Sequence, residues 1–296
     1  MSSWVPGTED DSGDTYDRPV SSVAERYQRF VDLHAGPGPF VMPNPWDAVS
    51  ARLLESLGFP ALATTSAGLA FATGVRDGTG VLGRDDILAN AATIVAATSL
   101  PVSADLEGGF GPSPDDCAVT IRAAAAVGLV GGSIEDATGD PARPLYEHAQ
   151  ACERVAAAVE ASAGLPFVLT ARTEGFLHGK ADLDVAIERL REFERLGADV
   201  LYAPGLPSLE AIREVCAAVT RPVNVVMGLL PEVWSVDELA DAGVRRISVG
   251  GSLARAALGA VHRAAAEIRD HGTFTYAAGA LPGPVATRLT TGGAGA

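Results

Sequence analysis

The sequence predicts an α/β protein folded as a (β/α)8 barrel of the TIM type. Eight short runs rich in apolar and β-branched residues recur along the chain, and amphipathic segments with helical period separate them. Nearly continuous apolar strands that alternate with helices form a covered parallel sheet, and eight such units match a barrel. The alternative is a doubly wound open sheet, but no Gly-x-Gly-x-x-Gly motif follows the first run.

The elements can be assigned in chain order. The expected strands are residues 40–44, 61–66, 101–106, 129–136, 167–173, 200–205, 222–228 and 245–251. Between the fifth and sixth strands, Leu183, Ile187 and Leu190 repeat at helical spacing, which indicates an amphipathic helix. Asp47 and the motifs "GRDD" and "SPDD" supply caps or early acids where other helices are expected to begin.

The same pattern gives the domain organisation. We expect a flexible acidic N-terminal lead over 1–22, one barrel that carries the site over 23–270, and a partly disordered C-terminal tail over 271–296. The chain has 296 residues and 47% hydrophobic content, which is enough to bury a large core.

Composition excludes several classes of partner. The formal net charge of −15 and a pI near 4.7 would repel a phosphate backbone, so we expect no nucleic-acid partner. No apolar run reaches the roughly 20 residues of a membrane span, and residues 1–20 lack a secretory signal pattern. Cys117, Cys152 and Cys216 lie in Ala-rich helical patterns without metal-type spacing. These features predict a cytoplasmic protein without a membrane partner.

Polar side chains gather where the expected strands end. In a barrel, the carboxyl ends of the strands meet at one mouth and carry the reacting groups. The residues at those ends are Asn44, Thr65, Ser66, Asp105, Glu107, Glu135, Asp136, Arg172, Thr173, Glu174 and Asn224. Oxygen ligands from separate strands suit Mg²⁺, with Mn²⁺ as an alternative, and the lack of a His/Cys cluster argues against zinc.

Each of these residues also has a simpler interpretation. Asp105 and Glu107 can cap the following helix, and Arg172 can be an ion-pair partner that neutralises the acids. Thr65 and Ser66 can cap a turn. The glycine pair in "SVGGS" can instead hold the phosphate of a flavin or a sugar phosphate.

Several motifs, kept in order over about residues 25–265, resemble a known superfamily. "NPWDAVSARLLESLGFPALATTSAGLAFATGVRDG", "ADLEGGFG", "SIED", "TARTEGF", "PVNVV" and "ELADAGVRRISVGGSLARAA" are similar to the isocitrate lyase and phosphoenolpyruvate mutase superfamily. The resemblance implies a barrel whose C-terminal helix is exchanged between subunits. It also implies a homotetramer built as a dimer of helix-swapped dimers, with Mg²⁺ and a small 2-oxo carboxylate or its enolate.

The resemblance assigns roles residue by residue. It places the metal ligands at Asp105, Glu107 and Glu135, and an acid near the metal at Asp77. It makes Arg172 the arginine that binds the substrate carboxylate. The remaining substrate contacts fall on Thr65, Ser66, Ala67 and Gly68, through backbone N–H groups of that loop, and on Asn224.

The chain departs from the superfamily after the strand-four glutamate. The known lyases carry a Lys-Lys/Arg-Cys-Gly-His lid there and the mutases a lid with lysine and asparagine. This chain has "EDATGDPARPLYEHAQACERV" instead. We therefore expect a Mg²⁺-dependent carbon–carbon lyase or decarboxylase, acting through a metal-stabilised enolate on a small 2-oxo acid or a 2-hydroxy, alkylmalate-type dicarboxylate. The alternatives are carbon–phosphorus chemistry of the phosphonopyruvate mutase or hydrolase type, and a non-catalytic 2-oxo acid binding protein.

Overall fold

The computed structural model describes residues 21–229 and 232–290, so residues 1–20 of the expected N-terminal lead lie outside the described part. Eight parallel strands form one sheet in the order β1-β8-β7-β6-β5-β4-β3-β2. From β2 to β8 each strand pairs with the next one in the sequence, and β1 pairs with β8. The strands are β1 (Phe40–Met42), β2 (Leu62–Ala63), β3 (Val102–Asp105), β4 (Gly131–Glu135), β5 (Val168–Arg172), β6 (Val200–Tyr202), β7 (Val223–Val226) and β8 (Arg246–Ser248). The predicted (β/α)8 barrel is confirmed.

The gap between β1 and β2 is bridged by two hydrogen bonds just beyond the strands. The Ala63 N–H donates to the Pro43 carbonyl at 3.1 Å, and the Asn44 Nδ2 donates to the Thr64 carbonyl at 2.9 Å. On the opposite side, β4 and β5 pair over five residues, from Gly131 with Val168 to Glu135 with Arg172. This register places an acid and an arginine side by side at the mouth.

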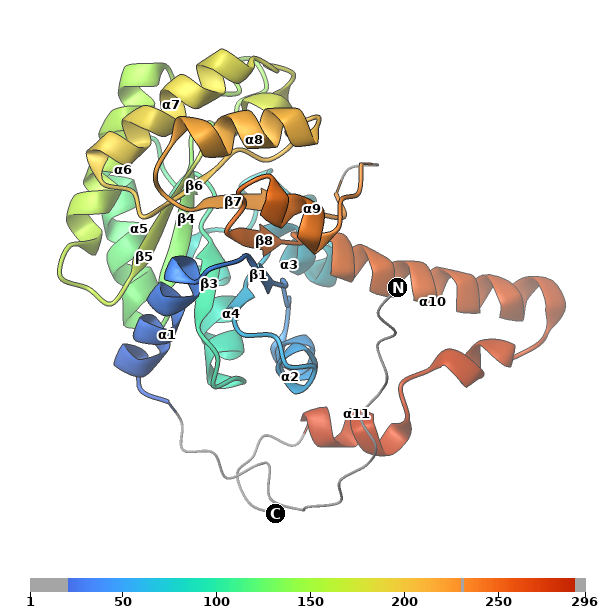
Figure 1. Ribbon diagram of the computed structural model, residues 1–296. Coiled ribbons are helices and arrows are strands. Elements are labelled where there is room, and N and C mark those ends of the chain that lie inside the picture. The colour runs from blue at the N-terminus through green and yellow to red at the C-terminus, as the bar shows by residue number, and fades with distance from the viewer. Residues whose placement is uncertain (1–20, 230–231, 291–296) are drawn as a thin grey trace.

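Helices cover the outer face of the barrel (Figure 1). They are α1 (Val23–Ala35), α2 (Ala48–Ser56), α3 (Ser66–Thr73), α4 (Arg84–Ala96), α5 (Pro114–Ala126), α6 (His148–Ser162), α7 (Leu183–Leu196), α8 (Leu209–Ala218), α9 (Val236–Asp241), α10 (Ser252–His271) and α11 (Gly283–Thr290), with 3-10 turns η1 (Gly175–His178) and η2 (Thr275–Gly279). None of the helices within the described ranges is long and apolar enough to cross a membrane.

The C-terminal part leaves the barrel. Helix α10 extends away from it, and the chain then turns back so that α11 reaches α2, where the Arg52 Nη1 donates to the Leu289 carbonyl at 2.8 Å (Figure 1). Residues 291–296 lie outside the described part, and the disorder expected for the tail stays a prediction.

Local sequence explains where the helices begin. The Asp47 side chain accepts a hydrogen bond from the Ser50 N–H at 2.7 Å, which makes Asp47 the N-cap that the sequence indicated for α2. Ser113 caps α5 in the same way, with Pro114 at the first helical position. Residues 66–68, expected as a loop, are instead the first turn of α3, because the Thr65 side chain caps them.

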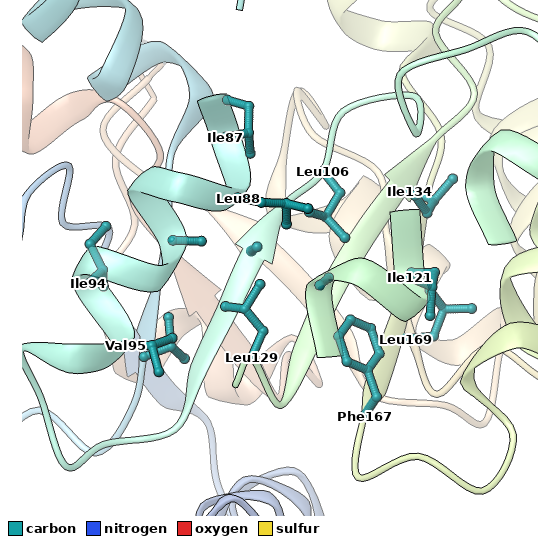
Figure 2. Packing of buried hydrophobic residues seen from close by; sticks show 14 of the residues in the cluster. Ile87, Leu88, Ile94, Val95, Leu106, Ile121, Leu129, Ile134, Phe167 and Leu169 are labelled. Atoms are coloured by element: carbon teal, nitrogen blue, oxygen red, sulfur yellow. The ribbon is translucent and has the colours of Figure 1, made fainter. Parts of the chain in front are cut away.

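The core between the sheet and the helices is apolar. Leu88 of α4 points toward Leu106, which follows β3, and both belong with Ile87 and Ile134 to one buried cluster (Figure 2). All four side chains are buried, and each buried side chain of this size contributes about 1.5–3 kcal/mol by leaving water. This packing fixes β3 and β4 relative to α4, and therefore fixes the loops that carry the acids.

Helix α1 closes the N-terminal end of the barrel. Phe30 is fully buried among Phe40, Val168 and Val200, which are the first residues of their strands. The His34 ring packs edge-on against Phe30 and Phe40. Its Nδ1 lies 2.7 Å from the Phe30 carbonyl, so Nδ1 carries the proton and Nε2 faces the Arg246 guanidinium at 3.5 Å.

We expect His34 to make stability depend on pH. Burial and the charge of Arg246 lower the pKa of His34 to about 3, whereas an unfolded histidine titrates near 6.5. Between these values the unfolded chain binds a proton that the folded chain rejects, so the folded state loses stability as pH falls from about 6.5. In urea unfolding, the stability advantage of the native protein over His34→Phe should shrink from pH 7 to pH 4. A difference that does not change with pH would contradict this assignment.

Candidate active site

The centre of the mouth is the Arg172 guanidinium at the end of β5. Its Nε contacts the Glu174 carboxylate, and its Nη1 lies 3.3 Å from Glu135 Oε2 and 3.5 Å from Asp105 Oδ1. The guanidinium carbon lies 5.0 Å from the centre of the Tyr202 ring. The neighbouring carboxylates raise the pKa of Arg172 well above its ordinary value, although burial opposes them. The ion-pair interpretation of Arg172 is therefore what its contacts show.

Asp105 lies between Arg172 and the start of α3. The Ser66 hydroxyl donates to Asp105 Oδ2 at 3.0 Å, and the Asp105 N–H donates to the Thr64 hydroxyl at 3.1 Å. Asp77, on the loop after α3, lines the same cavity as Ser66 and Asp105. The chain thus brings one acid from the end of β3 and one from a loop to the same part of the mouth.

Glu107 is placed by an unusual backbone conformation. Its φ of 47° lies in the left-handed region, as does the φ of 60° at Phe110, and a residue with a β-carbon is strained there. The Glu107 N–H donates to Asp105 Oδ1 at 3.3 Å, and its carbonyl accepts from the Glu135 N–H at 3.0 Å. At Gly108 a β-carbon would lie 2.9 Å from the Ala137 carbonyl oxygen, so only glycine allows this turn.

The carboxyl groups carry more negative charge than Arg172 offsets. Burial and the charges of Asp105 and Asp77 raise the pKa of Glu107 to about 7. Loss of solvation raises the pKa of Asp77, with the charge of Asp105 adding to it, and burial raises that of Glu135 despite its contact with Arg172. No other arginine or lysine in the described ranges lies within ion-pair distance of these acids.

This excess of carboxylate oxygens fits a hard divalent cation. Among the described residues, no group of three His, Cys, Asp or Glu side chains is gathered closely enough to hold a metal ion as it stands. Mg²⁺, however, usually takes one or two carboxylates and fills its other positions with water and substrate oxygens. Asp105, with Glu107 beside it and Glu135 behind Arg172, provides that donor set. The predicted three-ligand set stays a prediction.

The predicted substrate contacts on α3 also come to the mouth. Thr65 is the N-cap, and its hydroxyl accepts from the Gly68 N–H at 3.2 Å, which leaves Ser66 and Ala67 to offer the N–H groups of the first turn. A helix N-terminus favours an anion. A β-carbon at Gly68 would lie 3.0 Å from the Trp46 Cβ, so glycine also lets α3 pack closely.

Two asparagines lie deeper than the mouth acids. Both ends of the Asn224 amide are used, because Nδ2 donates to Ser248 at 3.0 Å and Oδ1 accepts from Arg246 at 2.9 Å. Asn44 Oδ1 accepts from the Val249 and Gly250 N–H groups, each at 2.9 Å. Those N–H groups are therefore occupied, which disfavours the phosphate interpretation of "SVGGS". A substrate contact by Asn224 stays a prediction.

Arg154 of α6 holds the loop between β3 and α5, residues 106–113, which carries Glu107 and is called the acid loop below. The sequence did not reveal this role. Arg154 is 1% exposed and donates to the carbonyls of Gly108, Gly111 and Ser113. Its guanidinium carbon also lies 4.2 Å from the centre of the Tyr146 ring. The acid loop and the segment after β4 therefore rest on one arginine.

Arg189 of α7 connects the segment after β4 to the residues that follow β5. It donates to Asp136 at 2.9 Å and to the Tyr146 carbonyl at 3.0 Å. Asp136 also accepts from the Thr173 hydroxyl at 2.7 Å and from the Glu174 N–H at 2.8 Å. Asp136 thus turns away from the mouth and positions Glu174.

The segment after β4 forms a short hairpin over the mouth. Ala137 pairs with Leu145, and the Tyr146 N–H donates to the Asp136 carbonyl at 2.9 Å. A cavity of about 850 Å³ lies beneath it, lined by the acids, Arg172 and Tyr146. None of the three cysteines lines this cavity.

We predict that Arg154→Met destabilises the protein by about 2–5 kcal/mol, because three backbone carbonyls lose their donor. The free energy of urea unfolding measures this. Arg122→Met, an exposed change on α5, is the matched control and should cost less than about 0.5 kcal/mol. Equal losses in the two variants would show that Arg154 does not hold the loop.

Comparisons with known proteins agree with this geometry. A family model described as phosphoenolpyruvate phosphomutase matches residues 30–269. A crystal structure from Burkholderia cenocepacia J2315, of a protein provisionally classed as a lyase or mutase, is 55% identical, with a TM-score of 0.87 over 90% of this chain and 95% of its own.

Two further relatives show more distant similarity. The 2-methylisocitrate lyase of Shewanella oneidensis is 29% identical over 223 residues, which is 73% of this chain and 75% of that enzyme. The oxaloacetate decarboxylase of Bradyrhizobium diazoefficiens is 28% identical over 258 residues, 83% of this chain and 85% of its own. Because the family model covers most of the barrel, the chain belongs to the phosphoenolpyruvate phosphomutase family, within the superfamily that also contains these lyases.

Proposed function

We propose that this protein is a Mg²⁺-dependent carbon–carbon lyase or decarboxylase that acts on a small 2-oxo acid or a 2-hydroxy, alkylmalate-type dicarboxylate. The observation that carries the proposal is the gathering of five acids around Arg172, which is only partly exposed: Asp77, Asp105, Glu107, Glu135 and Glu174. The named relatives support it, since one is a 2-methylisocitrate lyase and another is an oxaloacetate decarboxylase.

The acids would hold the metal, with Mn²⁺ as a possible replacement. When bound, Mg²⁺ supplies positive charge that draws electrons from the 2-oxo and carboxylate oxygens of the substrate. Asp105, kept in place by Ser66 and Arg172, is the principal ligand in this proposal. Glu107 and Glu135 would bind the metal ion directly or through a water molecule.

Arg172 and the start of α3 would bind the substrate carboxylate. In the described structure the Nε and Nη1 of Arg172 contact carboxylates, whereas Nη2 has no protein partner. A substrate carboxylate in the cavity can therefore accept a hydrogen bond from Nη2 on one side. On the other side it can accept hydrogen bonds from the N–H groups of Ser66 and Ala67. These contacts would orient the bond that breaks.

Proton transfer need not involve a thiol. Burial raises the pKa of Cys117, of Cys152 and of Cys216, the last to about 11, so none is a ready thiolate. Release of CO₂ from a 3-carboxy-2-oxo acid needs no base for the cleaving step, whereas retro-aldol cleavage does. Glu107, whose pKa is raised to about 7, is the carboxyl at the mouth best suited to exchange a proton in that second case.

The direct test is to remove the metal. Protein treated with EDTA should lose turnover of the best substrate among oxaloacetate, alkylmalates, 2-methylisocitrate and phosphonopyruvate, and Mg²⁺ or Mn²⁺ should restore it. Asp105→Ala should stay inactive after the metal is returned. Full activity in EDTA would reject the metal-dependent reaction, and turnover of phosphonopyruvate alone would favour carbon–phosphorus chemistry.

A second variant tests the carboxylate contact. Arg172→Lys keeps the positive charge but loses the planar fork, so KM should rise at least tenfold and kcat should fall. Arg84→Lys is the matched control, because Arg84 lines the cavity but bonds to Thr120. Steady-state kinetics that give an unchanged kcat/KM for Arg172→Lys would leave Arg172 a purely structural ion-pair partner.

We also propose that the protein forms a homotetramer of helix-swapped dimers. Helix α10 buries only Ala254 within one chain, while Leu258 and Val261 are 52% and 66% exposed. An apolar face left so exposed indicates a protein contact.

Light scattering should therefore report a tetramer for the native protein. Leu258→Asp should shift it toward smaller species, because a charge would be buried in the interface. Val119→Asp on α5 places the same charge on another exposed apolar residue and should not change the mass. A monomeric native protein would contradict the proposal.

A further inference from the structure

A second, smaller cavity lies inside the barrel, below the mouth. It measures about 60 Å³, and Asp105 and Arg172 line one part of it while Arg246 lines another. Its remaining wall combines apolar side chains with the polar Ser103, Ser133 and Tyr202. The cavity, called the chamber below, therefore has two guanidinium groups in its wall.

Arg246 is the unusual member of this chamber. It is 3% exposed and donates to Asn224 Oδ1 at 2.9 Å and to Thr170 Oγ1 at 3.0 Å, with His34 Nε2 3.5 Å away. A guanidinium has five N–H donors, so these three contacts leave two. No carboxylate in the described ranges lies within 4.0 Å of it, whereas Arg172 contacts three.

The groups in contact with Arg246 are neutral. Burial lowers the pKa of Arg246 to about 10, so the guanidinium stays charged at pH 7. His34 stays uncharged at that pH, and so does Tyr202, because burial raises the pKa of its phenol above the ordinary value. A buried cation that has only neutral partners is unfavourable, and an anion in contact with it would remove most of that cost.

We propose that this chamber binds a carboxylate-sized monoanion against Arg246. The volume admits a few atoms, since one water needs about 10–15 Å³ by the same measure, so formate, hydrogencarbonate or a halide fits and a whole dicarboxylate does not. The hydroxyls of Ser103 and Ser133 also line the chamber and can donate hydrogen bonds to such an anion. The anion is either free in solution or the terminal carboxylate of a molecule held at the mouth. The proposal does not rest on the enzymatic activity.

Bromide is the first probe, because its anomalous scattering identifies it. Crystals of the native protein soaked in sodium bromide should show an anomalous peak inside the chamber, within about 3.5 Å of the Arg246 guanidinium. Only water in the chamber at high bromide concentration would overturn the proposal.

A further crystal, grown with oxalate and Mn²⁺, distinguishes a free anion from the carboxylate of a molecule held at the mouth. An oxalate oxygen at Arg246 indicates a substrate carboxylate, and oxalate at Arg172 with bromide still at Arg246 indicates a free anion.

Formate is the second probe, used at constant ionic strength. A concentration ten times its Kd should raise the Tm of the native protein by roughly 3 °C. Arg246→Met should lose this rise, whereas Arg26→Met, which removes another buried arginine away from the chamber, should keep it. An equal rise in Arg246→Met would overturn the proposal. If Arg246→Met does not fold, the bromide map decides alone.

Discussion

The contact between the Arg172 guanidinium and the carboxylates of Asp105, Glu135 and Glu174 is the interaction on which the mouth of this barrel depends. A charge at the end of a buried strand needs partners, and β3, β4 and the residues just after β5 supply them. The register of β4 with β5 sets Glu135 beside Arg172, and β3 adds Asp105. Because the acids exceed the arginine in number, the same arrangement that stabilises Arg172 leaves negative charge for a metal ion.

Two other arginines, both buried, hold the loops around the mouth in place. Arg154 fixes the acid loop through backbone carbonyls, and Arg189 fixes the hairpin and Glu174 through Asp136. Tyr146 touches both arginines, by its ring and by its carbonyl. The hairpin base is therefore held by the same contacts that position the acids, while Arg143 near its tip is solvent-exposed. Movement over the cavity would involve the tip and not the base.

Much of the fold follows from the sequence alone. The eight apolar runs contain the eight strands, and their last residues reach the mouth, because strand period and parallel order are local and topological properties. The pattern could not show that residues 66–68 begin a helix, since Thr65 looked equally like a turn residue. The pattern also could not show that the Glu135 side chain points to the mouth while that of Asp136 points away from it. Asp136 is turned away by its contact with Arg189, which is distant in the sequence.

Two buried arginines have no marker in the sequence. Arg154 lies on a helix, where an arginine is normally solvent-exposed, and Arg246 lies in an expected strand next to a second arginine, Arg245. Only the three-dimensional arrangement shows that one donates to loop carbonyls and the other lines a chamber. The left-handed backbone at Glu107 also has no sequence signature beyond the glycines that follow it.

The central claim is that the charge excess around Arg172 is a metal site built on Asp105. The most direct measurement is a crystal structure of the protein with Mn²⁺, recorded at a wavelength where manganese scatters anomalously. The account predicts one peak at the mouth with an Asp105 carboxylate oxygen among its ligands, and loss of that peak in Asp105→Ala. A fully active protein whose mouth holds no manganese, or manganese bound away from Asp105, would contradict it.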